Sequence, residues 1–383
     1  MIENICKPEL CTGCAACFSA CPKACIQMKA DSEGFLRPVI DSTKCISCGK
    51  CQKTCPINHP IEDDGVKPAT YAVRVKESKV LMQSSSGGVF SGLAMKVLSL
   101  GGAVIGAGFD EEFQVTHKVC TDASGLDELR RSKYVQSRIG TVYQDAKALL
   151  ETGTQVLFCG TPCQVGGLKA YLGKESPNLY TVDFICHGVP SPMVWETYKA
   201  FREKQANSKI TDVSFRSKDK GWKTFSMKLF FEDGSEYSEL VSKDHYLRSF
   251  IMDLDLRPSC YQCQFKQIHR VSDITIADFW GAEKLNNDWN DDKGVSLVLV
   301  HSGKGHELLE ACSELLATIP FDFDEAIASN PSMTKSVSKR PMRKTFMRDV
   351  QKMPFDKVHE KYCGLSIGAK FRRKIADLLN KRG

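Results

Sequence analysis

The sequence predicts a small cysteine-rich module followed by a large, mostly parallel α/β domain that carries an α+β insertion. Three observations support this fold class. Two runs of four cysteines lie near the N-terminus, strand-like and helix-like segments alternate after residue 70, and 383 residues exceed one typical domain. We expect a module at 1–60, a linker at 61–69, the large domain at 70–330 and a basic C-terminal tail at 331–383.

The composition is that of an ordinary globular protein, with 42% hydrophobic and 26% charged residues. We expect a cytoplasmic protein, because no apolar run can span a bilayer and no apolar targeting segment follows Met1. Thiols stay reduced there, so 18 cysteines indicate metal or redox chemistry and not a disulfide framework.

The net charge of +6 is unevenly distributed. From Pro331 onward there are 15 Lys and Arg against 4 Asp and Glu, so the preceding residues are mildly acidic overall. Residues 1–330 are mildly acidic and contain no motif that binds in a nucleic-acid groove, which argues against nucleic-acid partners. The tail fits a solvated face better than a docking site for an acidic protein or a membrane surface.

The module begins with "CTGCAACFSACP" (11–22) and repeats it as "CISCGKCQKTCP" (45–56). Both follow the C-x2-C-x2-C-x3-C-P spacing of bacterial two-cluster ferredoxins, in which the fourth cysteine of each run usually ligates the other cluster. A pair of zinc sites is the alternative, but such sites need neither the additional C-x2-C spacing in each run nor the proline after its last cysteine. We interpret Cys6 and Cys25 as plain small residues. We expect one 4Fe–4S cluster to be bound by the first set, Cys11, Cys14, Cys17 and Cys55. We expect the other to be bound by the second set, Cys45, Cys48, Cys51 and Cys21.

Alternating segments after the linker predict the large domain. An antiparallel insertion is expected between 210 and 240, around an Asp-Gly turn. Strands are expected at 70–75, 103–109, 154–160 and 179–186, and helices at 87–102 and 164–172.

Four further cysteines stand at expected strand ends or turns: Cys163, Cys186, Cys260 and Cys263. The carboxyl ends of parallel strands converge on one crevice, so these thiols can meet there. A third 4Fe–4S cluster is our preferred interpretation, zinc is the main alternative, and buried cysteines that only pack are the simplest one. The remaining cysteines are interpreted as packing residues: Cys120, Cys159, Cys312 and Cys363.

Six motifs, in order over residues 70–281, resemble the family of coenzyme F420 hydrogenase/dehydrogenase beta subunits: "SSSGGVFSGLA", "RSKYVQS", "LFCGTPCQVGGLKAYL", "VDFICHGVPSP", "RPSCYQCQF" and "DITIADFWG". That family often carries an N-terminal two-cluster ferredoxin. The resemblance implies FAD in the large domain, an iron–sulfur cluster beside it, and electron exchange with a partner. Some members use the deazaflavin coenzyme F420, and others, such as hydroxymethyl chlorophyll reductase, use ferredoxin electrons on unrelated substrates.

Three of these motifs supply candidate flavin-binding residues. "SSSGG" lies at the start of an expected helix, whose free N–H groups favour a phosphate. The same residues would also fit an ordinary serine N-cap without a ligand. "RSKYVQS" offers a cation, an aromatic ring and a hydroxyl, with a solvated loop as the alternative. "GTPCQ" lies at a strand-to-helix turn. The candidates are Ser85, Ser86, Gly87, Gly88, Lys133, Tyr134, Ser137, Gly160, Thr161 and Gln164.

Two residues are candidate catalytic groups. His187 directly follows Cys186 and can donate a proton near the flavin or support the cluster, although a histidine packed in a turn is the commoner case. Asp278 ends an expected strand and either orients cofactor or substrate or caps the next helix.

The cysteine runs, together with what the family resemblance implies, predict an iron–sulfur flavoprotein oxidoreductase. Its expected partners are a redox protein or ferredoxin and a small two-electron donor or acceptor, either coenzyme F420 or another organic substrate. The alternative is an electron-transfer subunit without a substrate of its own.

Overall fold

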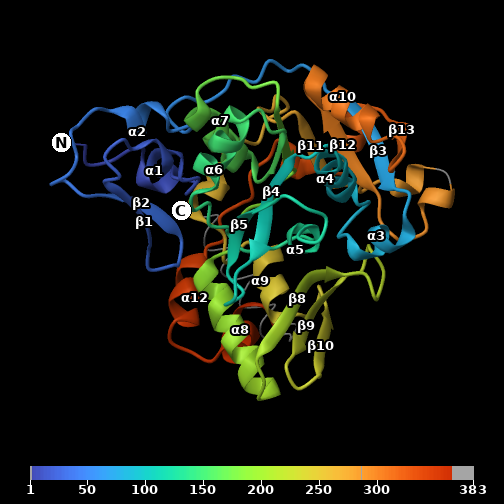
Figure 1. The fold of residues 1–383 in the computed structure, drawn as a ribbon. Helices are drawn as coiled ribbons and strands as arrows, with labels where there is room; N and C mark the ends of the chain where they lie inside the picture. Colours follow the sequence, from blue (N-terminus) through green and yellow to red (C-terminus); the bar gives the residue numbers. More distant parts are fainter. Residues whose placement is uncertain (1, 286, 365–383) are drawn as a thin grey trace.

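The computed structural model describes residues 2–285 and 287–364 of the chain. It contains a small N-terminal domain beside helices α6 (Val142–Glu151) and α7 (Pro162–Leu172) of a larger α/β domain (Figure 1). In the described ranges, no helix is long and apolar enough to cross a membrane.

The N-terminal domain repeats one loop geometry around its two cysteine runs. Gly13 and Ala15 have positive φ angles of 70° and 62°, and Ser47 and Gly49, at matching positions of the second run, have 54° and 71°. These left-handed residues curl each loop before a short helix begins. The domain comprises η1 (Pro8–Leu10), α1 (Ala16–Ala20), α2 (Lys50–Lys53) and the antiparallel pair β1 (Ile26–Ala30) and β2 (Leu36–Ile40).

The large domain is built on an eight-stranded sheet of order β13-β3-β12-β11-β7-β6-β4-β5. Its centre, from β11 through β7 and β6 to β4, is parallel, and the pairings on either side are antiparallel. Five of these eight strands therefore point the same way. The strands are β3 (Ala69–Val75), β4 (Ala103–Phe109), β5 (Val115–Cys120), β6 (Val156–Cys159), β7 (Leu179–Phe184), β11 (Ile274–Asp278), β12 (Ser296–Val300) and β13 (Leu316–Pro320).

Helices cover both faces of this sheet because its strands alternate buried side chains between them. Val104 and Leu157 pack with α4 (Val89–Ser99) on one face, whereas Ile105 and Phe158 pack with α6 and α7 on the other. The strands and helices predicted from residues 70 to 186 are present. Further helices are α3 (Ser78–Gln83), α5 (Leu126–Leu129), η3 (Ala282–Lys284), η4 (Asn287–Trp289), α10 (Gly303–Ala311), α11 (Phe323–Ala328) and η5 (Pro331–Met333).

The predicted insertion is a three-stranded antiparallel sheet of order β10-β9-β8. It shares an aromatic core with neighbouring helices, in which Trp195, Phe215 and Tyr246 are almost fully buried. Its elements are α8 (Pro192–Ala206), β8 (Ile210–Ser217), β9 (Ser226–Phe231), β10 (Glu236–Leu240), α9 (His245–Ile251) and η2 (Pro258–Gln262).

The region predicted as a basic C-terminal tail, 331–383, contains two packed helices in the part that the structure describes. Helices α12 (Arg343–Val350) and α13 (Phe355–Tyr362) pack into the core of the insertion through buried Phe346, Val350 and Val358. The charge count concealed this apolar face. The whole motif "KFRRKIADLLNKRG" (370–383) and residues 365–369 before it lie outside the described residues.

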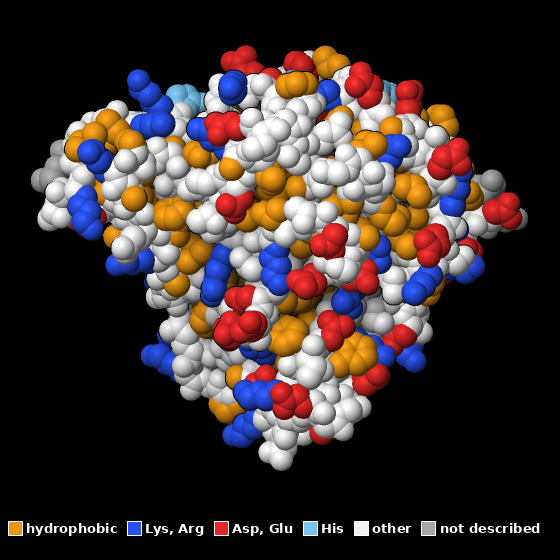
Figure 2. All heavy atoms as spheres, in the orientation of Figure 1, with side chains coloured by type: hydrophobic (Ala, Val, Ile, Leu, Met, Phe, Trp, Pro, Cys, Tyr) orange, Lys and Arg blue, Asp and Glu red, His pale blue; other side chains and the backbone are white. Residues whose placement is uncertain are grey.

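Several contacts attach the N-terminal domain to the large domain, and two of them lie at α7 and at the linker. Ala16 and Cys14 share a hydrophobic core with Val165 and Leu168 of α7. The linker is also fixed, because the Asp63 carboxylate accepts hydrogen bonds from the backbone N–H groups of residues 268 and 269. On the face seen in Figure 2, Lys and Arg side chains lie beside hydrophobic ones on the N-terminal domain.

Candidate functional site

One set of ferredoxin cysteines lines a pocket at the outer end of the N-terminal domain. This outer pocket encloses about 340 Å³, including its mouth, and Cys48 on its rim is exposed. Cys25, predicted to be a plain small residue, lies in the same wall with its sulfur 3.4 Å from that of Cys21. The second set, which lines this pocket, is Cys21, Cys45, Cys48 and Cys51.

The first set, Cys11, Cys14, Cys17 and Cys55, lies on the side of the domain that faces α7. Burial, followed by the charges of Cys55 and Cys11, raises the pKa of Cys14 to about 12. Cys6 is close to this set, since its thiol hydrogen bond is the main reason that the pKa of Cys11 is lowered to about 5. Both cysteines outside the ferredoxin pattern therefore lie beside a candidate cluster set.

The inner set, Cys163, Cys186, Cys260 and Cys263, lines a second pocket of about 470 Å³, including its mouth. Cys163 lies in the first turn of α7 and Cys186 follows β7, whereas Cys260 lies within η2 and Cys263 directly follows it. Burial, and then the charges of Cys260 and Cys263, raise the pKa of Cys186 to about 12. Three segments thus bring four thiols together at the carboxyl ends of parallel strands.

The inner pocket also contains three cations, Arg257, Lys266 and Arg270. Burial lowers the pKa of Lys266, and the thiolates of the pocket act in the opposite direction. Positive charge around four thiolates suits an iron–sulfur cubane, which is anionic together with its cysteine ligands. The four thiols and the cations of this pocket therefore fit a cluster. None of the twelve candidate ligands forms a disulfide.

No group of three or more His, Cys, Asp and Glu side chains in the described part of the chain converges on a single metal-ion position. The three cysteine sets are instead defined by the pockets that they line and by the charges that they share.

The inner pocket adjoins the first set. Thr12, between two cysteines of the first run, lines the inner pocket together with Cys163. The charge of Cys14 also contributes to raising the pKa of Cys163, after burial, Cys263 and Cys186. The first set and the inner set are therefore neighbours.

The candidate flavin residues fall into two neighbouring groups. In the first, the Ser85 hydroxyl accepts a hydrogen bond from the Ser132 N–H at 2.8 Å, which joins the "SSSGG" and "RSKY" loops. Burial lowers the pKa of the neighbouring Lys133 to about 7, and its ammonium donates to two backbone carbonyls. The Ser86 hydroxyl donates a hydrogen bond to the Val295 carbonyl, just before β12. The Gly87 N–H donates to the hydroxyl of Ser296, the first residue of β12.

The second group surrounds the start of α7. Thr161 caps this helix, and Gln164 completes a capping box by accepting the Thr161 N–H at 2.9 Å. Gln164 also donates to the Ser137 carbonyl at 3.4 Å, and the Ser137 hydroxyl pairs with His117 at 2.7 Å. These polar groups are satisfied locally, while the Thr161 hydroxyl lies 3.1 Å from the Cys163 sulfur. Gly160 joins β6 to this helix, and Gly88, with φ of 82°, is the N-cap of α4.

Asp278 does not cap a helix. Its carboxylate accepts hydrogen bonds from Arg216 at 2.5 Å and from the Trp222 indole at 2.9 Å. Sequence reasoning missed Arg216, which is 5% exposed and approaches Tyr134. Its Nε and Nη2 atoms are buried without a partner among the described residues. These unused donors, beside an aromatic ring, fit an anionic or carbonyl-bearing ligand such as a flavin.

His187 lies in the inner pocket and not among the candidate flavin residues. Its Nε2 atom pairs with the Asp253 carboxylate at 2.7 Å, and its ring meets Phe250 edge-on. Lys266 donates to its backbone carbonyl at 3.3 Å. The site that His187 can influence directly is therefore the inner cysteine set.

Comparisons with known proteins agree with this arrangement. Models of the 4Fe–4S dicluster domain match residues 10–59 and 37–89. The family model for the C terminus of the coenzyme F420 hydrogenase/dehydrogenase beta subunit matches residues 153–320. The protein is thus an iron–sulfur electron-transfer protein with an N-terminal ferredoxin domain. Over residues 153–320 it is similar to the family of coenzyme F420 hydrogenase/dehydrogenase beta subunits.

Two relatives show the range of the similarity. The F subunit of the F(420)H(2) dehydrogenase of Methanosarcina mazei is 23% identical over 191 residues, which are 46% of this chain and 52% of that protein. The chain therefore spans about half the length of this curated relative. A chain from the xenon-derivatised structure of the F420-reducing NiFe hydrogenase complex of Methanosarcina barkeri shares 19% identity, with a TM-score of 0.47. That comparison covers 80% of this chain and 97% of the other.

Proposed function

We propose that the chain is an iron–sulfur flavoprotein oxidoreductase that moves electrons between three cysteine-bound 4Fe–4S clusters, FAD and a two-electron partner. The observation that supports this most strongly is the inner pocket, where cysteines from three segments adjoin the first ferredoxin loop. Bound clusters would supply one-electron transfer and a flavin would exchange one or two electrons, so together they convert between the two kinds of chemistry.

The role of the protein residues in this proposal is to hold and space the redox sites. The first and second sets hold the ferredoxin clusters, and the inner set holds the third. Cys163 and Gly167 are one turn apart on α7, so one face of this helix meets both the inner pocket and Cys14. At the inner set, Arg257, Lys266 and Arg270 offset the negative charge of the thiolates.

The proposed FAD site lies among the "SSSGG" and "RSKY" loops and Arg216. Lys133 and Arg216 are the residues we expect to hold it. Burial disfavours the charged form of Lys133, which an anionic ligand would stabilise, and Arg216 has buried donors without a partner among the described residues. Asp278 would orient Arg216 through its hydrogen bond. Thr161 and Gly160, at the start of α7, would separate the flavin from the inner set. His187 is proposed to position the inner set and not to donate a proton to the flavin.

We propose that a protein redox partner docks at the outer pocket. Cys48 is exposed there, and Ile46 next to it is 58% exposed. Exposed lysines of the same domain, Lys23, Lys50 and Lys53, favour an acidic partner such as a ferredoxin. The two-electron partner at the flavin is proposed to be coenzyme F420 or a related organic molecule, as the family name and the Methanosarcina mazei relative suggest.

The second candidate function is an electron-transfer subunit that passes electrons to a separate catalytic protein. It is favoured by the curated relative, which is named as a subunit of a dehydrogenase. Steady turnover of an organic two-electron donor by the isolated chain would reject this alternative. Turnover only after addition of a co-purified protein would support it.

Anaerobic purification followed by iron, sulfide and flavin determination tests the proposed function. Three cubanes predict about twelve irons and twelve sulfides per chain, together with one flavin. About eight irons with no flavin would reduce the protein to a two-cluster carrier. Zinc in place of the last four irons would overturn the assignment of the inner set.

A further inference from the structure

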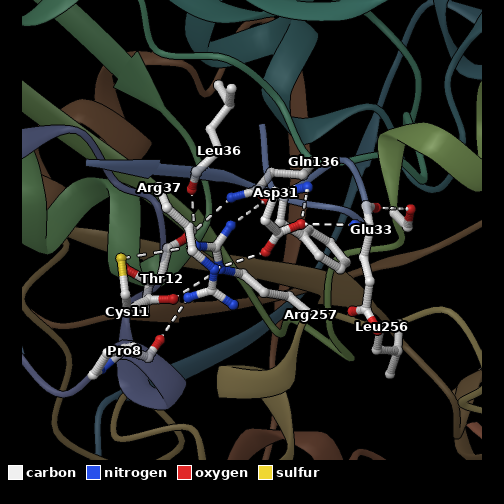
Figure 3. A network of polar contacts seen from close by, with 12 residues as sticks. Pro8, Cys11, Thr12, Asp31, Glu33, Leu36, Arg37, Gln136, Leu256 and Arg257 are labelled. Atoms are coloured by element: carbon white, nitrogen blue, oxygen red, sulfur yellow. Dashed lines mark hydrogen bonds and ion pairs between the residues drawn. The ribbon is translucent and has the colours of Figure 1, made fainter. Parts of the chain in front are cut away.

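Arg257 lies completely buried between the N-terminal domain and the large domain. Its Nε atom donates to the Cys11 carbonyl at 2.8 Å, and Nη2 donates to the Leu36 carbonyl at 2.9 Å. Figure 3 shows the guanidinium directed into this group of N-terminal residues. A fully buried cation is unfavourable unless its surroundings use its charge and its donors.

Gln136 and Gly13 complete the contact. Arg257 Nη1 donates to the Gln136 side chain at 2.7 Å, and Gln136 donates in turn to the Thr12 carbonyl at 3.0 Å. Gly13 has a φ of +70°, and a β-carbon there would lie 2.8 Å from both Arg257 Nη1 and Gln136 Nε2. The first cysteine loop is therefore held against Arg257 by backbone acceptors and by the absence of a side chain.

Arg257 faces two candidate cluster sites at once. Its Nη2 atom is 3.7 Å from the Cys11 sulfur, and the residue also lines the inner pocket, three positions before Cys260. A cation that stabilises a thiolate also stabilises an electron added to a cluster on that thiolate.

The outer pocket has no equivalent of this buried cation in its described lining. Its one charged lining residue is Lys23, which is exposed to solvent. Solvent screens such a charge, whereas the Arg257 charge acts in a buried environment. The two ferredoxin sites, alike in their cysteine spacing, thus differ in electrostatics.

We propose that Arg257 is a positioning residue that raises the reduction potential of the cluster on the first set above that of the cluster on the second set. Electrons that enter at the outer pocket then move towards the inner set. This inference rests on the proposed function, because it requires clusters at the three cysteine sets.

An EPR-monitored redox titration of the anaerobic full-length protein tests it. Loss of a signal in a Cys14→Ser variant identifies the cluster of the first set. The ratio is read at the potential at which this cluster is half reduced in the wild type. There, Arg257→Met should lower the ratio of reduced to oxidised cluster at least tenfold, which corresponds to a fall of about 59 mV in its one-electron midpoint potential. The cluster of the second set should change less than twofold.

Two further variants separate charge from structure. Gln136→Glu keeps an oxygen that accepts from Arg257 and places a carboxylate beside the guanidinium, although it loses the hydrogen bond that Gln136 donates to the Thr12 carbonyl. It should lower the same ratio at least threefold even if Arg257→Met does not assemble. Arg37→Met removes a partly exposed arginine of the same network, whose charge Asp31 already neutralises at 2.7 Å, and it should change the ratio less than threefold.

The inference is overturned if the ratio stays within twofold in Gln136→Glu and in any assembled Arg257→Met protein. An equal shift of both ferredoxin clusters, or an equal effect of Arg37→Met, also overturns it. The iron content of the wild type, measured separately, tests the proposed function itself, so the two failures are distinguishable.

Discussion

Gly167 of α7 lies against Cys14 of the first cysteine loop. A β-carbon at Gly167 would be 3.1 Å from both the β-carbon and the sulfur of Cys14, and 2.9 Å from the Tyr143 hydroxyl. Cys163 lies one turn earlier on the same helix. The missing side chain therefore lets the ferredoxin loop approach the helix that carries an inner cysteine.

Gly167→Ala should loosen this contact. Because the neighbours are a buried cysteine and a buried tyrosine, we expect the free energy of unfolding to fall by about 1–3 kcal/mol. Anaerobic urea unfolding, followed by tyrosine and tryptophan fluorescence, measures it. Gly303→Ala is the matched control, since no atom lies within 4 Å of the added carbon, and it should change stability by less than about 0.5 kcal/mol. Equal effects of both substitutions would contradict the proposed close contact.

The local features of the fold could be predicted from the sequence, because they depend on spacing along the chain. The repeated cysteine runs indicated the two ferredoxin loops, and Gly13 and Ser47 indeed take the left-handed conformations that such loops need. The alternation of apolar segments indicated the parallel centre of the sheet. The antiparallel pairings of β12 and β13 were not predicted, since their register depends on strands distant in sequence.

Three features of the site could not be predicted in the same way. Arg257 acts through contacts with residues more than 100 positions away, so no local pattern marks it. Cys25 and Cys6 carried a weak signal, because each lies within five residues of a ferredoxin cysteine. The packing of α12 was hidden by its many charges, although Phe346 and Val350 are spaced by one helical turn.

Removal of one inner cysteine should remove one cluster. Cys263→Ser leaves both ferredoxin sets intact, so we expect about eight of twelve irons to remain per chain. Iron and sulfide assays check this, and EPR should still detect two ferredoxin clusters. Cys120→Ser, which changes a buried cysteine outside the three sets, is the control and should keep the full iron content. Loss of all the iron in Cys263→Ser would contradict independent cluster sites.

Asp255 should make stability depend on pH. It is fully buried, one carboxylate oxygen accepts the Ser249 hydroxyl at 2.9 Å, and burial raises its pKa to about 7 from an ordinary value of 3.8. The folded protein therefore binds this proton more tightly than the unfolded chain, and stability is lost as the pH rises towards 7. Between pH 5.5 and 8 the wild type should lose about 2 kcal/mol through this group.

Asp255→Asn removes the titration and should flatten that part of the pH profile. Urea unfolding of both proteins at pH 5.5 and pH 8 measures the difference. Profiles of wild type and variant that run parallel over this range would show that Asp255 is already ionised in the folded protein.

The exposed lysines of the N-terminal domain should accelerate reduction by an acidic partner. With a small acidic two-cluster ferredoxin as the probe, Lys50→Glu/Lys53→Glu should reduce the second-order rate about tenfold at low salt. Stopped-flow absorbance measures this rate, and the difference should shrink as salt is added. Lys243→Glu, on the antiparallel insertion, should leave the rate unchanged, and dithionite should reduce all variants equally. A Lys243→Glu effect as large as that of the double variant would reject a specific docking surface.

The proposed electron path through the inner set is tested most directly by flavin reduction from the ferredoxin end. Reduced acidic ferredoxin is mixed anaerobically with the wild type and with Cys263→Ser, and flavin absorbance is followed by stopped flow. We predict that the flavin of Cys263→Ser is reduced at least a hundredfold more slowly, although its ferredoxin clusters are reduced at the wild-type rate. Flavin reduction at the same rate in both proteins would contradict the account.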